Sequence, residues 1–479
     1  MTEETDAGRL LPGEMVESTL KRKLSPGCVA LGARLDRIRF EWFYLVVALV
    51  WGVAIVVVVP PFQSPDEPAH YLRAWSVANL QLVSSPDQTV TVPENVASLP
   101  DRIGSAMIDW RTNLYSPRLA RSLLWERISL RRQEQYTSAS GAGPVGYLPP
   151  AVGIAVARGI QHSPLLGFYL GRACNLLASV IIVFFAIRLL PFGKPLMVLV
   201  GLFPMTISQM ASLSPDGLAL SGALMFVALV LSRAQKEAVT TRDVVWLGLA
   251  ATVLLNAKVG YAVLAMLVFV LAPRQLGGFK RYATCTGFVL AAAFAVAGAL
   301  FLTAPAASTA SLAKLGVTGV DPAGQLSFVT HHPYAFLKVL YATFETYATP
   351  LAQQTYGVLG WLQVGLPYVG MLLVGLAVVL FLGQTESVGL VAWQRFVIIL
   401  TGAAFAAEIG LALYMSWSAV ASPVVVGLQG RYFIPVTLLV LLGIYGVRLR
   451  TQRAAILLMI GVVAIVILTT LRALVKFYY

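Results

Sequence analysis

Apolar runs of about 17 to 25 residues recur along this chain, and a helix of that length can cross the roughly 30 Å hydrocarbon core of a membrane. Of the 479 residues, 58% are hydrophobic and only 12% are charged. A soluble domain of this size would carry more charge on its surface. The sequence therefore predicts an all-α, polytopic bundle of transmembrane helices.

Eleven of these runs are candidate spans. They cover residues 41–60, 165–187, 195–211, 217–232, 243–256, 258–272, 282–304, 363–383, 394–416, 432–447 and 454–473. The shorter run 145–161 contains Pro149 and Pro150, and we expect a re-entrant or interfacial helix there. Because boundaries taken from a single sequence are soft, twelve or thirteen crossings remain open alternatives.

The net charge of +13 is carried mainly by short connections between the apolar runs. If the spans alternate, one side of the membrane holds the basic segment 1–40 together with Arg188, Lys194, Arg233, Lys236, Arg242, Arg274, Lys280, Arg281, Arg395, Arg448, Arg450 and Arg453. The positive-inside rule assigns that side to the cytoplasm. We expect a bacterial inner-membrane protein with a cytoplasmic N-terminus, a disordered tail over 1–40 and no nucleic-acid partner.

The opposite, extracytoplasmic face is expected to hold two large loops. The first, 61–164, carries aromatic residues among arginines, which is typical of juxtamembrane helices at headgroup depth in contact with membrane lipids. The second covers 305–362. Turns around Asp216 and around residues 256–261 lie on the same face, so the unusual polar groups of the chain collect there.

An acidic pair, Asp66 and Glu67, follows the first span within a proline-rich fragment. Pro68 suits the first position of a helix, so both carboxylates would stand at the positive end of that helix. His70 and Arg73 would lie on one face of it, with His70 one turn from Asp66. One wall could thus carry an acid, an imidazole and a guanidinium.

The same residues have a plainer interpretation. Ser-Pro-Asp occurs at 64–66, 85–87 and 214–216, and it is an ordinary helix start in which the carboxylate caps the first turn. On local pattern alone, capping by Asp66 is as well supported as catalysis. A single interfacial histidine such as His70 is also more often a hydrogen-bonded surface group than a ligand.

Three more ionisable residues lie at predicted membrane boundaries on the same face: Asp216, Lys258 and Arg431. A charge drawn to the bilayer centre costs on the order of 2.5–3.5 kcal/mol, so Lys258 should have polar company or else extend to the headgroups. Carboxylates beside cations suit transfer from a lipid-linked phosphate. A carboxylate can take the proton of an attacking hydroxyl, and a fixed cation can stabilise a phosphate leaving group.

The order of these features resembles the GT-C superfamily of membrane glycosyltransferases: a first span, an acidic pair, a juxtamembrane helix, Tyr-Leu-Pro-Pro at 147–150, then Asp216 and Lys258. The motifs Pro-Pro-Phe-x-x-Pro-Asp-Glu-x-x-His, Ser-Pro-Asp-Gly and Gln-Gly-Arg-Tyr-Phe also resemble a bacterial family of predicted multi-spanning proteins of unassigned function. The likeness covers nearly the whole chain after residue 40 and implies one GT-C-like membrane domain over 41–479.

The resemblance implies transfer of a sugar from a polyprenyl-phosphate donor to an envelope glycan, lipid or protein outside the cytoplasm. By motif position it implies catalytic roles for Asp66, Glu67 and Asp216. It implies substrate binding by His70, Arg73, Tyr147, Lys258 and Arg431, with the phosphate on Lys258 and Arg431.

Two questions stay open at this point. The first loop lacks an Asp-x-Asp signature, so a divalent cation is uncertain, although Asp66, Glu67 and Asp216 could supply oxygen ligands. The main functional alternative is a transporter or flippase of lipid-linked envelope precursors, and a non-catalytic envelope partner is a third. Transporters commonly show internal repeats and midplane charges, whereas here the ionisable groups gather toward one face and no repeat is visible.

Overall fold

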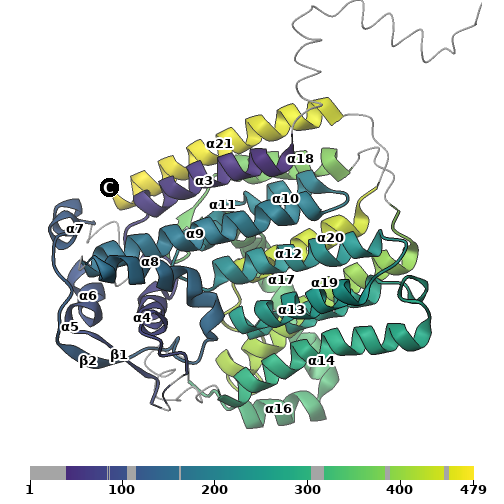
Figure 1. Cartoon of the computed structure of the whole chain (residues 1–479), viewed down its shortest axis with the longest axis horizontal. Coiled ribbons are helices and arrows are strands. Elements are labelled where there is room, and N and C mark those ends of the chain that lie inside the picture. The colour runs from purple at the N-terminus through teal and green to yellow at the C-terminus, as the bar shows by residue number, and fades with distance from the viewer. Residues whose placement is uncertain are drawn as a thin grey trace, which may run out of the picture.

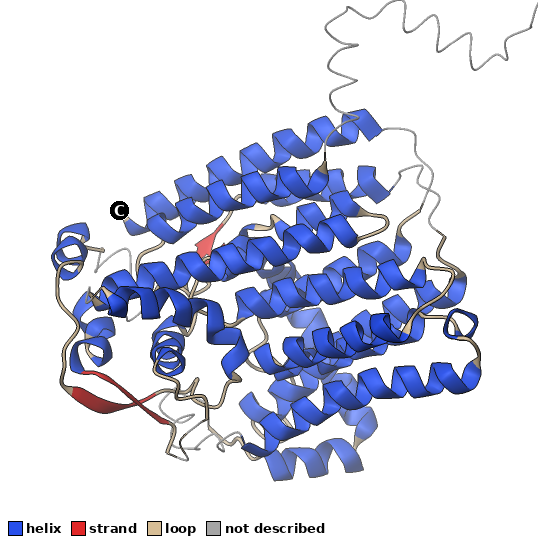
Figure 2. Cartoon of the chain, viewed as in Figure 1, coloured by secondary structure: helices blue, strands red, loops and turns tan. Residues whose placement is uncertain are grey.

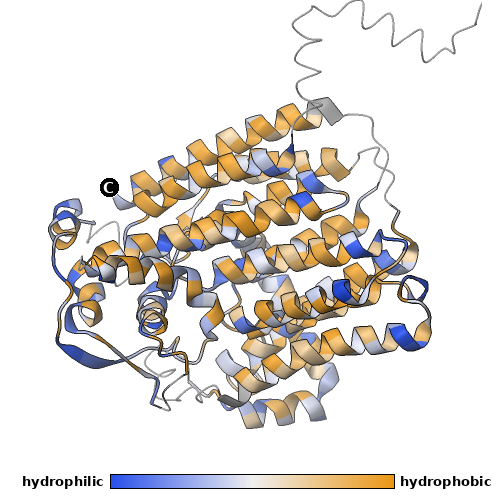
Figure 3. Cartoon of the chain, in the orientation of Figure 1, coloured by the Kyte–Doolittle hydropathy of each residue, from blue (hydrophilic) through white to orange (hydrophobic). Residues whose placement is uncertain are grey.

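Long apolar helices running side by side make up most of the molecule (Figure 1). The structure is a computed structural model that describes residues 39–83, 85, 87–104, 115–160, 163–303, 318–382, 389–446 and 452–479. Except for its last two residues, the tail expected over 1–40 lies outside this described part. Apolar residues dominate the helices, and polar residues gather at the two ends of the bundle (Figure 3).

Six described helices are long and apolar enough to span a membrane. They are α3 (Phe40–Val58), α9 (Pro164–Leu189), α12 (Asp216–Ala234), α14 (Phe279–Thr303), α19 (Ala392–Trp417) and α21 (Gln452–Tyr478). The prediction of a polytopic helical bundle is confirmed in this coarser form. The expected eleven to thirteen crossings are not confirmed, because the remaining apolar runs form shorter or different elements.

Proline and tight coiling account for much of that difference. The run 195–211 divides into α10 (Lys194–Gly201) and α11 (Pro204–Met210), because Pro204 forces Phe203 into an extended conformation. The run 258–272 forms the 3-10 helix η2 (Val259–Val270), which extends about 24 Å at about 2.0 Å per residue. Three other runs give helices of 17, 15 and 11 residues, namely α13 (Thr241–Ala257), α18 (Tyr368–Leu382) and α20 (Ile434–Ile444).

The segment after α3 folds into a small layer of its own at one end of the bundle, here called the α4 end. It comprises α4 (Glu67–Ala78), β1 (Thr89–Pro93), α5 (Glu94–Ala97), α6 (Leu99–Ile103), α7 (Pro117–Leu123), β2 (Arg132–Tyr136), η1 (Pro144–Tyr147) and α8 (Leu148–Gly159). Phe62, Tyr71, Trp75 and Phe168 form its buried aromatic core. The helix expected after Asp66 is therefore present, and the short run at 145–161 contributes a single 12-residue helix.

Two small sheets of two strands each accompany the helices, and the described chain is mostly helical as expected (Figure 2). Strands β1 and β2 pair antiparallel with Thr89 opposite Tyr136, and alternation along β1 buries Val90 and Val92. The second sheet is the hairpin of β3 (Val358–Leu359) and β4 (Val364–Gly365). The described part of the expected loop 305–362 is otherwise helical, with α16 (Pro322–His331) and α17 (Pro333–Gly357), while two short 3-10 turns are η3 (Pro273–Leu276) and η4 (Gly430–Phe433).

The connections rich in lysine and arginine meet at the end opposite α4, here called the basic end. Gln275 donates a hydrogen bond to the Ala234 carbonyl, and Arg395 donates one to the carbonyl of Tyr445. The Tyr445 ring stacks on Phe192 from another connection. The C-terminal ends of α12 and α20 therefore lie at this basic end.

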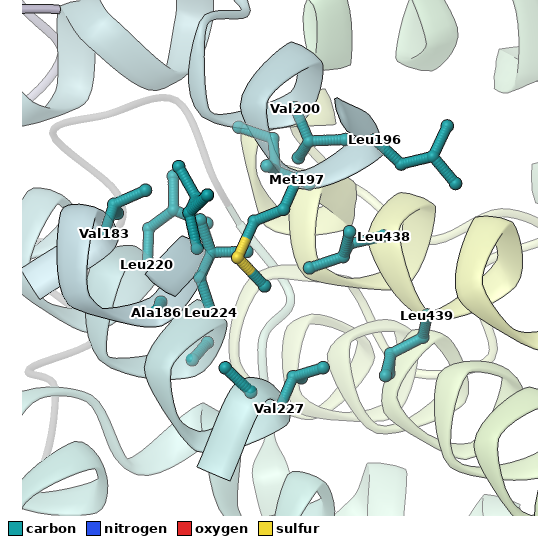
Figure 4. Packing of buried hydrophobic residues seen from close by; sticks show 14 of the residues in the cluster. Val183, Ala186, Leu196, Met197, Val200, Leu220, Leu224, Val227, Leu438 and Leu439 are labelled. Carbon is teal, nitrogen blue, oxygen red and sulfur yellow. The ribbon is translucent and has the colours of Figure 1, made fainter. Parts of the chain in front are cut away.

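Close packing in the middle of the bundle holds these helices in register (Figure 4). Within a membrane, lipid tails are as apolar as leucine, so packing contacts carry the association of helices. The labelled side chains come from α9, α10, α12 and α20: Val183, Ala186, Leu196, Met197, Val200, Leu220, Leu224, Val227, Leu438 and Leu439. This contact joins α9, α10, α12 and α20 in one buried core.

A buried ion pair fixes how the α4 layer sits on the bundle. Arg172 of α9 and Glu67 of α4 are both fully buried, and two nitrogens of the guanidinium meet the two carboxylate oxygens at 2.6 and 2.8 Å. The same carboxylate accepts a hydrogen bond from the Leu213 amide. Arg172 also donates to the carbonyls of Val59 and Pro60 at the end of α3. One ion pair thereby joins α3, α4, α9 and the turn before α12.

The losses of stability from removing Glu67 and Arg172 should be coupled and not additive. Arg172→Met leaves a buried, unpaired carboxylate and should lower the free energy of unfolding by about 3–5 kcal/mol. In the double variant Glu67→Leu/Arg172→Met, the loss should be smaller than the sum of the single losses by about 2 kcal/mol or more. Thermal unfolding in detergent is measured for Arg172→Met, for Glu67→Leu and for the double variant. Strictly additive losses would contradict the assignment.

Candidate functional site

Four charged side chains from distant parts of the chain converge at the α4 end. Lys258 Nζ lies 2.5 Å from Asp216 Oδ1, and Arg431 Nε lies 3.4 Å from Asp216 Oδ2. Arg431 Nη2 is also 3.5 Å from Asp66 Oδ2. The two carboxylates and two cations therefore form one continuous cluster, hereafter the charged cluster. It balances two negative against two positive charges.

Helix ends deliver these side chains to the cluster. Asp66 is the residue before α4, Asp216 is the first residue of α12, and Lys258 directly follows α13. Both carboxylates stand at positive helix ends, where the ionised form is favoured. The Asp66 side chain makes no capping hydrogen bond, so the plainer interpretation of this aspartate is wrong.

The two aspartates differ sharply in exposure. Asp66 adopts a left-handed backbone conformation with φ of 60°, which costs a residue with a side chain about 1 kcal/mol or more. Its side chain is 57% exposed, compared with 11% for Asp216. The strained turn therefore leaves one carboxylate accessible to solvent. The other stays buried between the cations.

A hydrogen-bonding network from α9 sets the position of Asp216. Asn175 donates to the carbonyls of Ser212 and Ser214 at 2.7 and 3.1 Å, which shapes the turn before α12. The hydroxyl of Ser214 in turn accepts a hydrogen bond from the Asp216 amide. The buried aspartate is therefore held by backbone contacts as well as by its two cations.

His70 and Tyr147 form the neutral part of the site. His70 Nδ1 and the Tyr147 hydroxyl are 2.8 Å apart. Burial lowers the pKa of His70, although the nearby carboxylates of Asp66 and Asp216 oppose this effect. Burial raises the pKa of Tyr147, so its hydroxyl keeps its proton. At neutral pH the pair can exchange hydrogen bonds with hydroxyl groups without adding charge.

The segment that carries Tyr147 comes unusually close to the turns that carry the ions. A Cβ at Gly143 would collide with the Asn256 carbonyl, next to the end of α13. A Cβ at Gly146 would fall 2.6 Å from Cβ of Pro215, just before α12. Only glycine permits this approach at both positions. Larger residues there would push Tyr147 away from the charged cluster.

Arg431 carries a donor that the protein leaves unused. Its side chain is 5% exposed, and among the described residues its Nη1 meets no hydrogen-bond acceptor. Its guanidinium and the Lys258 ammonium lie 5.3 and 4.7 Å from the centre of the Tyr432 ring, within the range of a cation–π interaction. Buried donors are normally satisfied, so Nη1 is available to a hydrogen-bond acceptor from outside the described chain.

Two of the eight residues expected in the site lie elsewhere. Glu67 faces Arg172 and is fully buried, so it does not join Asp66. Arg73 is also buried and donates to the carbonyls of Leu82 and Ala142, which ties loops of the α4 layer together. The expectation that Arg73 shares a wall with His70 is thus corrected. Arg73 is three residues after His70 on the same helix, but its long side chain reaches a different loop.

The carboxylates do not assemble into the oxygen cage that a divalent cation would need. Within the described ranges, no three His, Cys, Asp or Glu side chains lie close enough to hold a metal ion. Glu67 is engaged by Arg172, and Asp216 by Lys258 and Arg431. The expected ligand set of Asp66, Glu67 and Asp216 therefore does not fit a metal. No step of the proposed reaction passes through one.

Sequence reasoning missed three residues that shape the site: Arg172, Asn175 and Tyr432. A signal existed for the first two, because a charged or amide side chain inside an apolar run marks a functional or paired position. Both lie within the candidate span 165–187. The third follows Arg431 directly in the sequence, where nothing distinguishes a ring that supports two cations from one at the membrane interface.

Residues 49–440 match the model of a family described as a predicted membrane protein, DUF2142. No curated protein matches the chain. A crystal structure of the Archaeoglobus fulgidus oligosaccharyltransferase, tethered with an acceptor peptide, is similar over 92% of this chain at 13% identity and a TM-score of 0.38. The match covers 56% of that protein, so this chain spans little more than half its length.

The lowered pKa of His70 predicts that stability rises with pH. Below pH 6.5, its ordinary pKa, the unfolded chain binds this proton more readily than the folded protein. The stabilisation is complete above pH 6.5 and is lost as the pH falls, at up to about 1.4 kcal/mol per pH unit. His70→Gln should flatten the dependence between pH 7 and 5 in thermal unfolding, whereas His331→Gln, on exposed α16, should leave it unchanged. Equal slopes in both variants would contradict the prediction.

Proposed function

The chain belongs to the DUF2142 family of predicted membrane proteins, and we propose that it works within the membrane as a glycosyltransferase. The proposed reaction moves a sugar from a polyprenyl-phosphate donor to an envelope glycan, lipid or protein at the α4 end. One observation carries the proposal: an exposed carboxylate, Asp66, lies beside two cations that a buried carboxylate holds in place. The order of motifs along the chain adds the resemblance to GT-C enzymes.

Asp66 is the proposed general base. A hydroxyl of the acceptor attacks the anomeric carbon of the donor sugar and gives its proton to the Asp66 carboxylate. The bond between the anomeric carbon and the phosphate oxygen breaks, and the phosphate leaves with the electron pair. The strained, exposed position of Asp66 supports this role because an acceptor can approach it from solvent.

Lys258 and Arg431 are the proposed contacts of the donor phosphate. Charge grows on the phosphate as it leaves, and fixed cations in a site of low polarity stabilise such charge strongly. The unused Nη1 of Arg431 supplies a donor for one phosphate oxygen. Asp216 is then a positioning residue, since it holds both cations and keeps the empty site electrically balanced.

His70 and Tyr147 are proposed to bind hydroxyl groups of the sugar or acceptor. Their hydrogen bond places two neutral polar groups beside the charged cluster, where they can orient a substrate without changing its charge. Glu67 and Arg73, in contrast, have structural roles, because Glu67 pairs with Arg172 and Arg73 ties loops of the α4 layer together. The proposed catalytic set is therefore smaller than the motif order implies.

The α4 end is proposed to face away from the cytoplasm of a bacterial inner membrane. The cations of the opposite, basic end support this orientation through the positive-inside rule. A polyprenyl-phosphate sugar would then reach the charged cluster from the outer leaflet. The N-terminus would lie in the cytoplasm.

Asp66→Asn tests the catalytic assignment. The amide keeps the shape of the side chain but cannot take a proton, so sugar transfer in reconstituted vesicles should fall about 10²- to 10⁴-fold. Asp87→Asn is a matched control, because Asp87 ends a second Ser-Pro-Asp sequence and is exposed within the same segment. Transfer is measured for each purified variant with a panel of polyprenyl-phosphate sugars. An unfolding curve for each variant shows whether it is folded.

The outcomes of that assay separate the functional classes. Transfer that survives in Asp66→Asn at the level of Asp87→Asn would remove Asp66 from the mechanism. Movement of a lipid-linked sugar across the vesicle membrane without transfer would favour a flippase. If no donor in the panel is consumed or moved by wild type, the enzymatic proposal fails for these donors.

Lys258→Gln should weaken binding of the donor about 10- to 100-fold. A charge-assisted hydrogen bond contributes about 1.5–3 kcal/mol, and 1.4 kcal/mol corresponds to one factor of ten. Equilibrium binding of a radiolabelled polyprenyl-phosphate sugar measures the change. Lys338→Gln, which removes a lysine that lies over the ring of Tyr334, should bind like wild type. Equal affinities in all three proteins would contradict the role of Lys258.

A further inference from the structure

A cavity of about 610 Å³ lies at the α4 end, between α17, α18, α21 and the hairpin of β3 and β4. Its walls are largely apolar and include Tyr356, Leu366 and Met371. Two cationic side chains, Arg472 and Lys476, also line it. The proposed sugar transfer uses none of these residues.

The two cations form a pair on one helix face. Arg472 and Lys476 are four residues apart on α21, so they lie one above the other along the same side. Both are exposed, and no carboxylate in the described part of the chain pairs with either. A doubly positive site facing an apolar cavity therefore has no carboxylate partner among the residues that the structure describes.

The cavity lies between helices that present apolar surface to the outside. Leu372 and Val379 of α18 and Leu468 and Val475 of α21 are exposed, which suits contact with lipid chains. The last turn of α21 reaches the end of α3, where the Tyr479 hydroxyl donates to the Val58 carbonyl. The two cations thus stand near the membrane boundary at the α4 end, although most connecting cations lie at the basic end.

Polar groups accompany the cations at the cavity wall. The Gln353 side chain donates a hydrogen bond to the Tyr368 hydroxyl at 3.0 Å, and both residues line the cavity. An amphiphile with an anionic head and ester groups next to it would find cations, a hydroxyl, an amide and an apolar wall in one cavity. A free inorganic anion would leave the apolar wall without a partner.

We propose that this cavity binds a phosphate-bearing anionic membrane lipid. Arg472 and Lys476 hold the phosphate, and the hydrocarbon chain lies along Leu366 and Met371. The site is distinct from the charged cluster, because none of the four charged residues of that cluster lines the cavity. Trp361 in that hairpin donates a hydrogen bond to the Phe62 carbonyl, four residues before Asp66. The proposal does not depend on sugar transfer.

Binding to the purified full-length protein in dodecyl maltoside tests this site. Dioleoyl phosphatidylglycerol should raise the unfolding temperature in a saturable way, whereas inorganic phosphate and dioleoylglycerol at the same concentrations should not. Arg472→Gln/Lys476→Gln should weaken phosphatidylglycerol binding at least about tenfold. The matched control Arg118→Gln/Arg121→Gln removes two exposed charges on α7 at the same end and should bind like wild type.

A second variant tests the apolar part. Thr469→Trp fills the cavity without changing its charge and should also weaken binding. Stabilisation by inorganic phosphate equal to that by the lipid would overturn the lipid assignment in favour of a simple anion site. Equal loss of binding in the α7 control would show attraction to surface charge only and would also overturn it. Binding is measured without a sugar donor, so failure of the glycosyltransferase proposal leaves this test intact.

Discussion

The buried ion pair of Glu67 and Arg172 is the constraint from which the site follows. A lone charge within an apolar bundle is costly, so each partner holds the other in place and with it the segments they belong to. The pair brings α4 onto α9 and ties both to the turn before α12. Asp66, the preceding residue, is thereby placed at the edge of the bundle. The two adjacent carboxylates therefore have opposite environments: Glu67 is buried against Arg172, and Asp66 is exposed.

In the charged cluster, too, carboxylates hold cations in place through ion pairs. Lys258 and Arg431 would repel each other in an apolar setting, and Asp216 between them lowers that cost. The preassembled cations are then available to an incoming phosphate without large rearrangement, which is the condition for electrostatic stabilisation of a transition state. In the proposed reaction, exposed Asp66 would face the acceptor and the Arg431 donor would face the phosphate.

Cations at the α4 end occur in two settings that differ in charge balance. In the charged cluster, carboxylates compensate Lys258 and Arg431. At the cavity between α17, α18 and α21, Arg472 and Lys476 have no such compensation within the described chain. This favours the anionic lipid proposed for that cavity. The hairpin of β3 and β4 contacts both regions, since it lines the cavity and reaches the loop that leads to Asp66. The proposed lipid site and the charged cluster are thus linked through this hairpin and share no residues.

Local patterns in the sequence determined the helical membrane bundle, the start of α4 and the collection of Asp66, Asp216, Lys258 and Arg431 on one face. These features depend on apolar run length, proline and charge, each of which acts over a few residues. Only the tertiary structure decided that Glu67 turns inward to Arg172, 105 residues away, while Asp66 turns outward. It also decided that Arg73 leaves the site and that several apolar runs form short helices. Such outcomes depend on which distant segment packs opposite a side chain, and hydrophobic periodicity along the chain carries no information about that partner.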